Sequence, residues 1–364
     1  MVRSRRAALV PLLAISTAAG LVAATPTTGA AARAADVKVV TKGLDGPFGL
    51  QKAVRHRGFV VAESVSGEVT RVFPRGRQRV ILDGVPGVAG VAASPRKVFA
   101  VIGGPNEEGE PSGGAYGPSR VLRMNYRGGQ VKVIANLMKY ELKHNPDGQQ
   151  QFVNGQPVDA LSNPFAMTWS RFGLFVADGG GNDVLRVNPR TGKVKTFFVP
   201  PTFRDTKQCR ADDANANPGT KGCDPVPTGV AVVGGSLYVS MLGAEAPGAG
   251  RIYKLDARTG NVQRVWKGLT APTGIAARPD GTMYVSEVLE GAPVGPPTPG
   301  FDPSTVGQIT RIAPNNKQTH AQVTMPTGLV LHDGKLYSSA WSIASFLGIE
   351  DAGQVVRVKE SAFK

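Results

Sequence analysis

Short stretches rich in β-branched and aromatic residues recur along this chain, separated by turns rich in Gly, Pro, Asn and Asp. The clearest unit occupies residues 268–312, with apolar runs at 274–277, 283–287 and 308–312, and a fourth run ends near Val323. Runs of this kind predict β-strands, and none keeps a helical period over three turns. The unit therefore predicts four consecutive strands, which we name A to D in chain order.

This unit recurs six times along the chain. Strand A begins with Pro-Thr-Gly in three of the copies, and strand C carries a basic residue near its end in most of them. Repeats of this length are typical of solenoids and propellers. Small residues in strand A favour the propeller, because its innermost strands crowd the axis. The predicted fold is all-β: a six-bladed β-propeller of four-stranded blades.

The sixth copy stops after strand C, whereas the start of the chain holds a strand without a unit of its own. Residues 37–44 resemble residues 262–269, which form a strand D. The N-terminal strand is therefore predicted to close the last blade. Closure of this kind removes exposed sheet edges, which otherwise invite aggregation. Residues 35–364 then form a single β-propeller domain.

Residues 1–34 lack the repeat and predict an export signal peptide. Arg3, Arg5 and Arg6 precede an apolar run rich in Ala and Leu, and a small-residue cleavage site lies near Ala34. This order is typical of secretory signals. A membrane anchor is the disfavoured alternative, because Thr and Gly interrupt the apolar run; the general and twin-arginine export routes both stay open. We expect a secreted, extracellular protein whose mature chain has no transmembrane segment.

The formal net charge of the whole chain is +15 at pH 7, and removing the four signal-peptide arginines and no acids leaves about +11, from 15 minus 4. Aromatic residues make up 7% and no long run of Lys and Arg occurs, so nucleic acid is not the expected partner. In a propeller the A–B and C–D turns open on one face. That face collects basic residues, which makes an anionic cell-envelope polymer a candidate partner. These residues are Arg55, Arg57, Arg75, Arg77, Arg96, Lys97, Arg127, Arg171, Arg190, Arg258, Arg278, Lys317 and Lys335.

Five long insertions interrupt the repeat, and all fall in B–C loops or D–A links. These connections open on the face opposite the short turns, so the insertions are predicted to share one face, richer in acids than the other. Long loops on a rigid scaffold commonly carry function, although drift on a tolerant surface is the alternative. We expect this face to bind a small molecule, a polymer or a protein, and the chain to be a monomer. The insertions are residues 103–118, 138–161, 201–224, 288–306 and 342–352.

Cys209 and Cys223 are the two cysteines, and both lie in the third insertion. An exported chain favours a disulfide between them. The bridge would close a loop of about 15 residues and contribute on the order of 3 kcal/mol in the chain-entropy model. A metal site is the less favoured alternative, because no His pair lies nearby.

Three alternate blades end strand B in a carboxylate: Glu63, Asp178 and Glu287. Near the axis these groups are candidate ligands for a divalent cation, with Ca, Mg or Mn preferred by hard oxygen donors. The alternative is structural, with the carboxylates paired to arginines and sealing the mouth of the propeller. Both interpretations stay open on the residues alone.

Polar residues near the same face are further candidates for ligand contacts. His144 is the histidine that falls in an insertion and is a candidate catalytic base, although a lone loop histidine is more often inert. No nucleophile elbow or zinc-binding His-Glu-x-x-His motif accompanies it. The candidate ligand-binding residues are Asn145, Asp147, Asn163, Asn182 and Asp183.

The order of residues 145–148, 162–165 and 176–187 resembles the ScyD/ScyE family of exported bacterial proteins. The Pro-Thr-Gly segments at 227–229 and 272–274 fit as well, and the resemblance covers essentially the whole mature chain. It implies a six-bladed propeller similar to NHL-type and gluconolactonase-type folds. The family has no settled activity to carry over, and this chain departs from it in its basic charge and its cysteine-containing insertion.

The favoured function is a non-enzymatic, exported propeller that binds a ligand with its insertion face. The first alternative is a metal-assisted hydrolase or lactonase resembling the gluconolactonase class, since a metal-bound water needs no histidine. The second is a virginiamycin-B-lyase-like enzyme, which would require seven blades.

Overall fold

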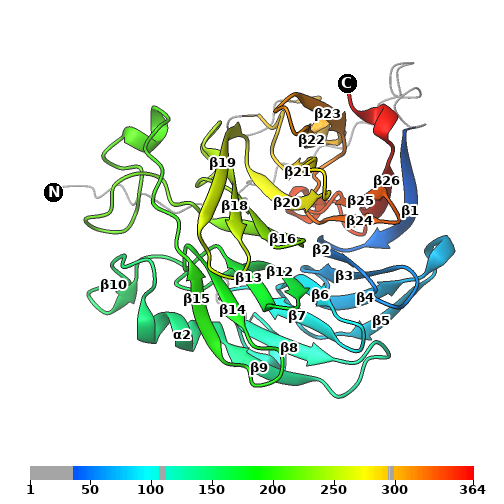
Figure 1. The fold of residues 1–364 in the computed structure, drawn as a ribbon, viewed down its shortest axis with the longest axis horizontal. Helices are drawn as coiled ribbons and strands as arrows, with labels where there is room; N and C mark the ends of the chain where they lie inside the picture. Colours follow the sequence, from blue (N-terminus) through cyan, green and yellow to red (C-terminus); the bar gives the residue numbers. More distant parts are fainter. Residues whose placement is uncertain (1–35, 106–111, 294, 296–298) are drawn as a thin grey trace.

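The computed structural model describes residues 36–105, 112–293, 295 and 299–364 (Figure 1). The predicted signal peptide lies outside the described residues. Six four-stranded antiparallel sheets are arranged as blades around an axis. The prediction of an all-β, six-bladed propeller is therefore confirmed.

Each blade runs from an innermost strand A to an outermost strand D, in chain order except in the last. Blade 1 contains β2 (Pro47–Lys52), β3 (Phe59–Glu63), β4 (Glu68–Val72) and β5 (Gln78–Leu82), and blade 2 contains β6 (Val88–Ala93), β7 (Val98–Ile102), β8 (Arg120–Met124) and β9 (Lys132–Asn136). Blade 3 contains β12 (Pro164–Ser170), β13 (Gly173–Asp178), β14 (Asp183–Val187) and β15 (Val194–Phe198), and blade 4 contains β16 (Pro227–Val233), β17 (Ser236–Met241), β18 (Gly250–Asp256) and β19 (Val262–Leu269). Blade 5 contains β20 (Pro272–Ala277), β21 (Met283–Glu287), β22 (Gln308–Ile312) and β23 (Gln318–Gln322), and blade 6 contains β24 (Leu329–His332), β25 (Lys335–Ala340), β26 (Gly353–Val358) and β1 (Val37–Leu44).

The remaining elements are short and most lie in the connections between strands. The second insertion carries α2 (Leu137–His144) and a hairpin of β10 (Phe152–Val153) and β11 (Gln156–Pro157). No helix in the described part of the chain is long and apolar enough to cross a membrane. The short 3₁₀ helices are η1 (Pro74–Gly76), η2 (Gly114–Tyr116), η3 (Gln208–Arg210), η4 (Pro303–Thr305), η5 (Ala344–Leu347) and η6 (Glu360–Ala362).

The ring is closed by the two ends of the described chain, as predicted. β1 pairs antiparallel with β26, with Val37 opposite Val358 and Lys42 opposite Gln354. In Figure 1 the blue β1 lies beside the red β26 at the outer edge of the last blade. Since strands far apart in sequence complete one sheet, blade 6 has no unpaired outer edge at β26.

The Pro-Thr-Gly segments that open strand A hold neighbouring blades together near the axis. The hydroxyl of Thr228 donates to the carbonyl of Pro272 at 2.7 Å, and that of Thr273 donates to Pro326 at 3.1 Å. The glycine allows the close approach: a Cβ added at Gly274 would lie 1.9 Å from the Thr327 carbonyl oxygen. The repeated sequence is therefore explained by packing at the axis.

Apolar side chains fill each space between neighbouring blades. Between blades 2 and 3, for example, Phe99 and Leu174 are buried from facing sheets. A further apolar cluster covers the axis on the insertion face, with Phe48, Val288 and Met325 among its buried members. The sheets are thus buried on both faces, which leaves turns and insertions as the exposed functional surface.

Candidate functional site

The three carboxylates at the ends of strand B are buried, and each binds the link that leads into its own blade. Glu63 accepts the Asp45 backbone N–H at 2.9 Å, and Glu287 accepts that of Thr270 at 2.6 Å. Asp178 accepts the Asn163 backbone N–H and the Ser162 hydroxyl, both at 2.7 Å. Each carboxylate therefore holds the D–A link against strand B by accepting a backbone N–H, and no described arginine forms an ion pair with it.

A cation shared by these three groups is not supported by their arrangement. Among the described residues, no group of three or more His, Cys, Asp or Glu side chains is placed to hold a metal ion. The Glu287 carboxylate is also occupied by Gln308 at 3.1 Å and by the Thr310 hydroxyl. On the axis itself, the space between the A strands is only about 40 Å³. The shared cation remains a prediction from the sequence, and we derive no chemistry from it.

A large cavity lies on the opposite face, among the short turns of blades 1 to 3. Its volume is about 910 Å³. We call it the basic cleft, because nine of its lining residues are cationic and none is acidic. The cationic residues are Arg55, Arg96, Lys97, Arg123, Arg171, Arg186, Arg190, Lys193 and Lys195.

The charges of the basic cleft are not neutralised by the protein. None of the nine takes part in an ion pair within the described ranges. Arg171 lies over the Phe172 ring at 4.8 Å from its centroid, and Arg123 donates to the Pro189 carbonyl at 3.1 Å. Such contacts orient the guanidinium groups but leave their charge uncompensated. Trp169 and Phe172 add aromatic surface to the lining.

Sequence analysis placed five of the nine cationic residues on this face but missed the other four. Arg123 and Arg186 belong to strand C, and Lys193 and Lys195 lie at the start of strand D of blade 3 or just before it. The signal for Arg123 and Arg186 was the recurring basic residue of strand C, which served above only to define the repeat. The cleft also lies on the face opposite the predicted ligand-binding insertions.

On the insertion face, the candidate ligand residues are partly brought together. The Asn182 side chain donates to Asp147 at 3.2 Å, and Asn145 donates to the Gln149 carbonyl at 2.9 Å. Asp183 is fully buried beside Asp178, its partner in the β13–β14 pair. Asn163 donates its backbone N–H to Asp178, and its side-chain Oδ1 accepts the Gly104 N–H at 2.8 Å, which ties blade 3 to blade 2.

These residues belong to a wider group that we call the acidic network. Its carboxylates come from α2, from the second and third insertions and from the β13–β14 connection. No described Lys, Arg or His forms an ion pair with any of them. Burial raises the pKa of Glu141 to about 8, with smaller contributions from Asp178 and Asp147. The members are Glu141, Asp147, Asp159, Asp178, Asp183 and Asp224.

Among the described residues, the candidate base His144 contacts Tyr140 and forms no hydrogen bond with a carboxylate. It is the last residue of α2 and is exposed. Its ring stacks on Tyr140, with the centroids 4.4 Å apart. The Tyr140 hydroxyl in turn receives the Thr196 backbone N–H at 2.8 Å. This packing anchors α2 to the outer strand of blade 3.

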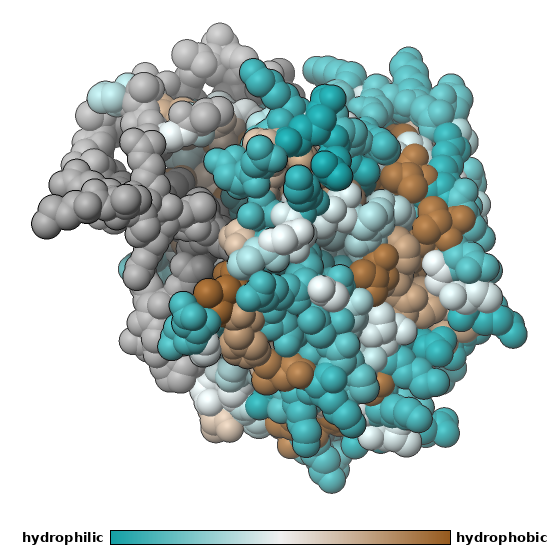
Figure 2. Space-filling model, turned by 90° about the vertical axis from the view of Figure 1, so that its left-hand side faces the viewer, coloured by the Kyte–Doolittle hydropathy of each residue, from teal (hydrophilic) through white to brown (hydrophobic). Residues whose placement is uncertain are grey.

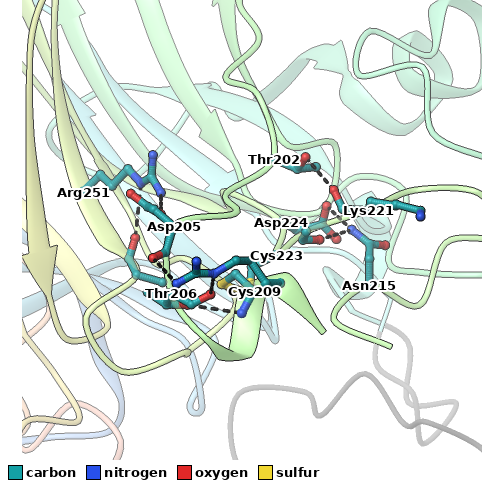
Figure 3. Close-up of a disulfide and its surroundings, with 12 residues drawn as sticks. Thr202, Asp205, Thr206, Cys209, Asn215, Lys221, Cys223, Asp224 and Arg251 are labelled. Carbon is teal, nitrogen blue, oxygen red and sulfur yellow. Dashed lines mark hydrogen bonds and ion pairs between the residues drawn. A yellow bond between two sulfur atoms is a disulfide. The ribbon is translucent and has the colours of Figure 1, made fainter. Parts of the chain in front are cut away.

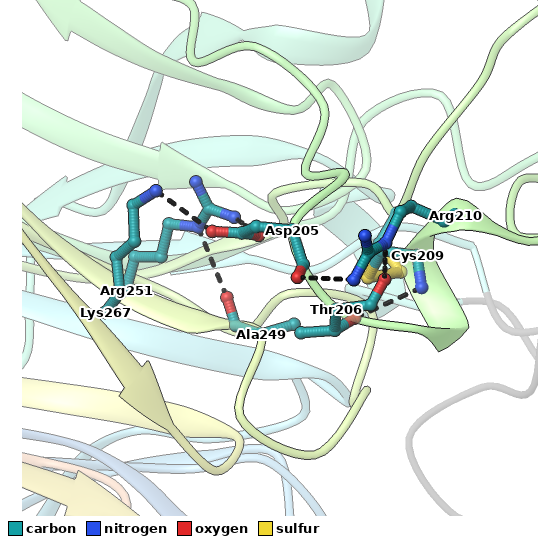
Figure 4. Close-up of polar contacts among 8 residues, drawn as sticks. Asp205, Thr206, Cys209, Arg210, Ala249, Arg251 and Lys267 are labelled. Carbon is teal, nitrogen blue, oxygen red and sulfur yellow. Dashed lines mark hydrogen bonds and ion pairs between the residues drawn. A yellow bond between two sulfur atoms is a disulfide. The ribbon is translucent and has the colours of Figure 1, made fainter.

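The third insertion is anchored by the predicted disulfide, Cys209–Cys223, which is confirmed (Figure 3). The backbones of Phe203 and Cys223 also exchange hydrogen bonds at 2.8 and 2.9 Å. Asp205 forms ion pairs with Arg251 and Lys267 of blade 4 (Figure 4). The insertion is therefore fixed to the propeller in spite of its polar sequence.

The side of the molecule that carries α2 and β10 in Figure 1 is mainly hydrophilic (Figure 2). Hydrophobic residues appear on this visible side in small, scattered groups. Polar and charged groups therefore dominate what this side offers to a partner.

Comparison with solved structures supports the fold. The chain is similar to a luciferin-regenerating enzyme, with 10% identity, a TM-score of 0.55, and coverage of 90% of this chain and 96% of that one. It is also similar to a gluconolactonase of Xanthomonas campestris, with 12% identity, a TM-score of 0.53, and coverage of 92% and 93%. A streptogramin B lyase gives 14% identity, a TM-score of 0.50, and coverage of 90% and 97%.

At these identities the similarity establishes the fold and not a reaction. No family model matches the chain, and no curated protein matches it in sequence. The ScyD/ScyE resemblance therefore stays a prediction from the sequence. The lyase alternative required seven blades, whereas the described residues form six. Together, the six blades and these structural neighbours establish a β-propeller architecture for the described chain.

Proposed function

We propose that this protein is a non-catalytic binding propeller that holds an anionic polymer in its basic cleft. The observation that carries the proposal is a cavity of about 910 Å³ lined by nine cationic residues and no carboxylate. Like charges gathered in one concave surface repel each other, and a bound polyanion relieves that repulsion. Potentials of this kind also attract charged ligands over a distance.

The shape of the cleft favours a polymer over a small anion. Its cationic residues come from turns and strands of blades 1, 2 and 3, so they are spread along the face of the propeller. Trp169 and Phe172 supply apolar faces against which a sugar ring packs. A repeating anionic polysaccharide or polyol phosphate matches both features.

The predicted export of the protein fits the same proposal. Disulfides persist in oxidising compartments, and Cys209–Cys223 anchors an exposed insertion. An exported basic protein would meet the anionic polymers of the cell envelope. The insertion face would then stay free for a second ligand, as the sequence predicted.

Binding of labelled polygalacturonate and polyglycerol phosphate tests the proposal, with neutral dextran as the reference polymer. The double variant Arg171→Glu/Arg190→Glu should weaken binding by about tenfold or more. The matched control is Arg258→Glu/Lys317→Glu, which makes the same change of charge on the same face outside the cleft. It should weaken binding only slightly.

Binding should also weaken strongly as the Debye length falls from about 10 Å at 0.1 M salt to about 3 Å at 1 M. Equal losses in the two double variants would show that the cleft has no special role. Failure to bind either anionic polymer at low salt would overturn the proposal.

The hydrolase alternative keeps one distinguishing test. If Glu63, Asp178 and Glu287 hold a catalytic cation, the protein should hydrolyse a sugar lactone, and Asp178→Asn should abolish the activity. Lactone hydrolysis that survives the charge reversals in the cleft and is lost with Asp178→Asn would favour this alternative over the binding propeller.

A further inference from the structure

The acidic network contains buried oxygen atoms that accept no hydrogen bond from any described residue. Both carboxylate oxygens of Asp183 are buried without a hydrogen-bond partner, and the residue has no exposed surface. The side-chain carbonyl oxygens of Asn145 and Asn217 are also buried and without a partner. All four atoms are acceptors. A buried acceptor without a donor is costly, so these oxygens favour a bound donor or cation.

The orientation of the two asparagines is fixed by their other contacts. The Asn217 amide nitrogen donates to Gln149 Oε1 at 2.6 Å and to Asp159 Oδ2 at 2.8 Å. Both partners are acceptors, so reversing the amide would place oxygen against oxygen. The Asn145 nitrogen likewise donates to a carbonyl oxygen, that of Gln149. The hydrogen bonds of the amide nitrogens therefore fix the side-chain oxygens of Asn145 and Asn217 in the positions that lack a donor.

Glu141 brings a second carboxylate toward Asp183. Its Oε1 accepts a hydrogen bond from Gln151 at 2.9 Å. Its Oε2 lies beside Gly181, where an added Cβ would be 3.0 Å from Oε2 and 3.3 Å from the Leu161 carbonyl oxygen. A side chain at this position would enter the space between the carboxylate and the carbonyl. Gly181 thus keeps oxygen atoms close together two residues before Asp183.

The charges of this region also lack compensation. Burial raises the pKa of Asp183 well above its usual value, and Asp178, Glu141 and Asp147 raise it further. These four acids act on one another without a cationic side chain paired to any of them in the described chain. Buried charges are normally paired or coordinate metals.

We propose that Asp183 and Glu141 bind one calcium ion that holds the second insertion against the β13–β14 connection. No three carboxylates of the described residues are grouped to hold a metal, so the remaining ligands would be neutral oxygens and water. Calcium takes six to eight oxygen ligands and accepts carbonyl, amide and water oxygens beside carboxylates. The Leu161 carbonyl, which lies beside Gly181 as Glu141 Oε2 does, and the unpartnered Asn145 side-chain oxygen are candidates. Asp183 begins β14 opposite Asp178 in blade 3, whereas Glu63 and Glu287 end strand B in blades 1 and 5.

Calorimetric titration of the full chain, stripped of metal by a chelator, tests this proposal. Calcium should bind saturably at one ion per chain, with a dissociation constant between about 10⁻⁶ and 10⁻³ M. Asp183→Asn keeps the size of the side chain and should weaken binding by about tenfold or more. Glu63→Gln is the matched control, because it neutralises a buried carboxylate at the end of strand B in a different blade. It should leave the calcium affinity unchanged.

Two results would overturn the proposal. The first is the absence of calcium binding in the stripped wild-type chain, by heat and by elemental analysis after dialysis against calcium. The second is binding that Glu63→Gln abolishes and Asp183→Asn does not, which would move the ion to the axial carboxylates. If Asp183→Asn does not fold, Glu141→Gln replaces it with the same expected loss. An unchanged affinity in a folded Glu141→Gln would contradict the assignment.

Discussion

The basic cleft and the acidic network both bring like charges together, but the charges are exposed to water in the cleft and buried in the network. Both gather charges of one sign, and both involve blades 2 and 3, on opposite faces of the propeller. In the cleft, residues such as Arg171 and Arg190 are exposed, so water screens their repulsion. In the network, Glu141 and Asp183 are buried, with 4% and 0% of their surface exposed. Exposed like charges are tolerated in the folded protein without a ligand, because water screens them. Buried like charges must be neutralised in the folded state by a proton or a cation.

The comparison predicts that calcium affects stability only through the network. With calcium at about a thousandfold above the dissociation constant, the free energy of unfolding of the wild type should rise by about 4 kcal/mol. Asp183→Asn should remove this gain, while Arg171→Gln in the cleft should keep it. Urea unfolding of the three proteins with calcium and with chelator measures the difference. An equal gain in all three would break the distinction between the regions.

Loss of the disulfide should change calcium binding by the acidic network and leave polymer binding by the basic cleft unchanged. The third insertion supplies Asn217 and ends in Asp224, both part of the network's hydrogen bonds. The double variant Cys209→Ser/Cys223→Ser should lower the free energy of unfolding by about 3 kcal/mol and weaken calcium binding. Binding of the anionic polymer should be unchanged, because the insertion does not line the cleft. Parallel calorimetric titrations with calcium and polymer provide the check.

An isolated, half-buried carboxylate gives the reference for both regions. Burial raises the pKa of Glu245 to about 7. Since the folded state holds this proton more tightly than the unfolded state, stability falls as pH rises from about 4.5, the unfolded value, through 7. The loss is on the order of 1–3 kcal/mol. Glu245→Gln should flatten this part of the profile, measured by urea unfolding between pH 5 and 8. A wild-type profile identical to that of the variant would contradict the assigned burial effect.

Periodicity in the sequence was enough to predict the blades, the closing strand and the faces on which turns and insertions emerge. These follow from local rules: strand composition, turn residues, and the requirement that a ring leave no free edge. The disulfide was predictable because two cysteines in one insertion leave a single pairing. The Pro-Thr-Gly repeat marked strand A, although its role as an inter-blade hydrogen bond became visible only in space.

The partners of charged residues could not be predicted in the same way. The repeat places three carboxylates at equivalent positions, Glu63, Asp178 and Glu287, which suggested a shared ion. In the structure each carboxylate accepts a hydrogen bond from a backbone N–H, and the repeat pattern does not predict this partner. The basic cleft needed residues from turns and strands of three blades. In the network, Gln149 of the second insertion bonds Asn217 and Asp224, which lie more than 60 residues further along the chain.

The sequence by itself determined the architecture of this protein, because strand period and turn chemistry are local properties of the chain. The tertiary structure alone decided which charges are exposed, which are buried, and which lie next to one another. Electrostatic energies depend on distance and on the surrounding dielectric, and neither quantity is written in the order of the residues. For that reason the cleft and the unpartnered Asp183 could be recognised only once the blades were in place.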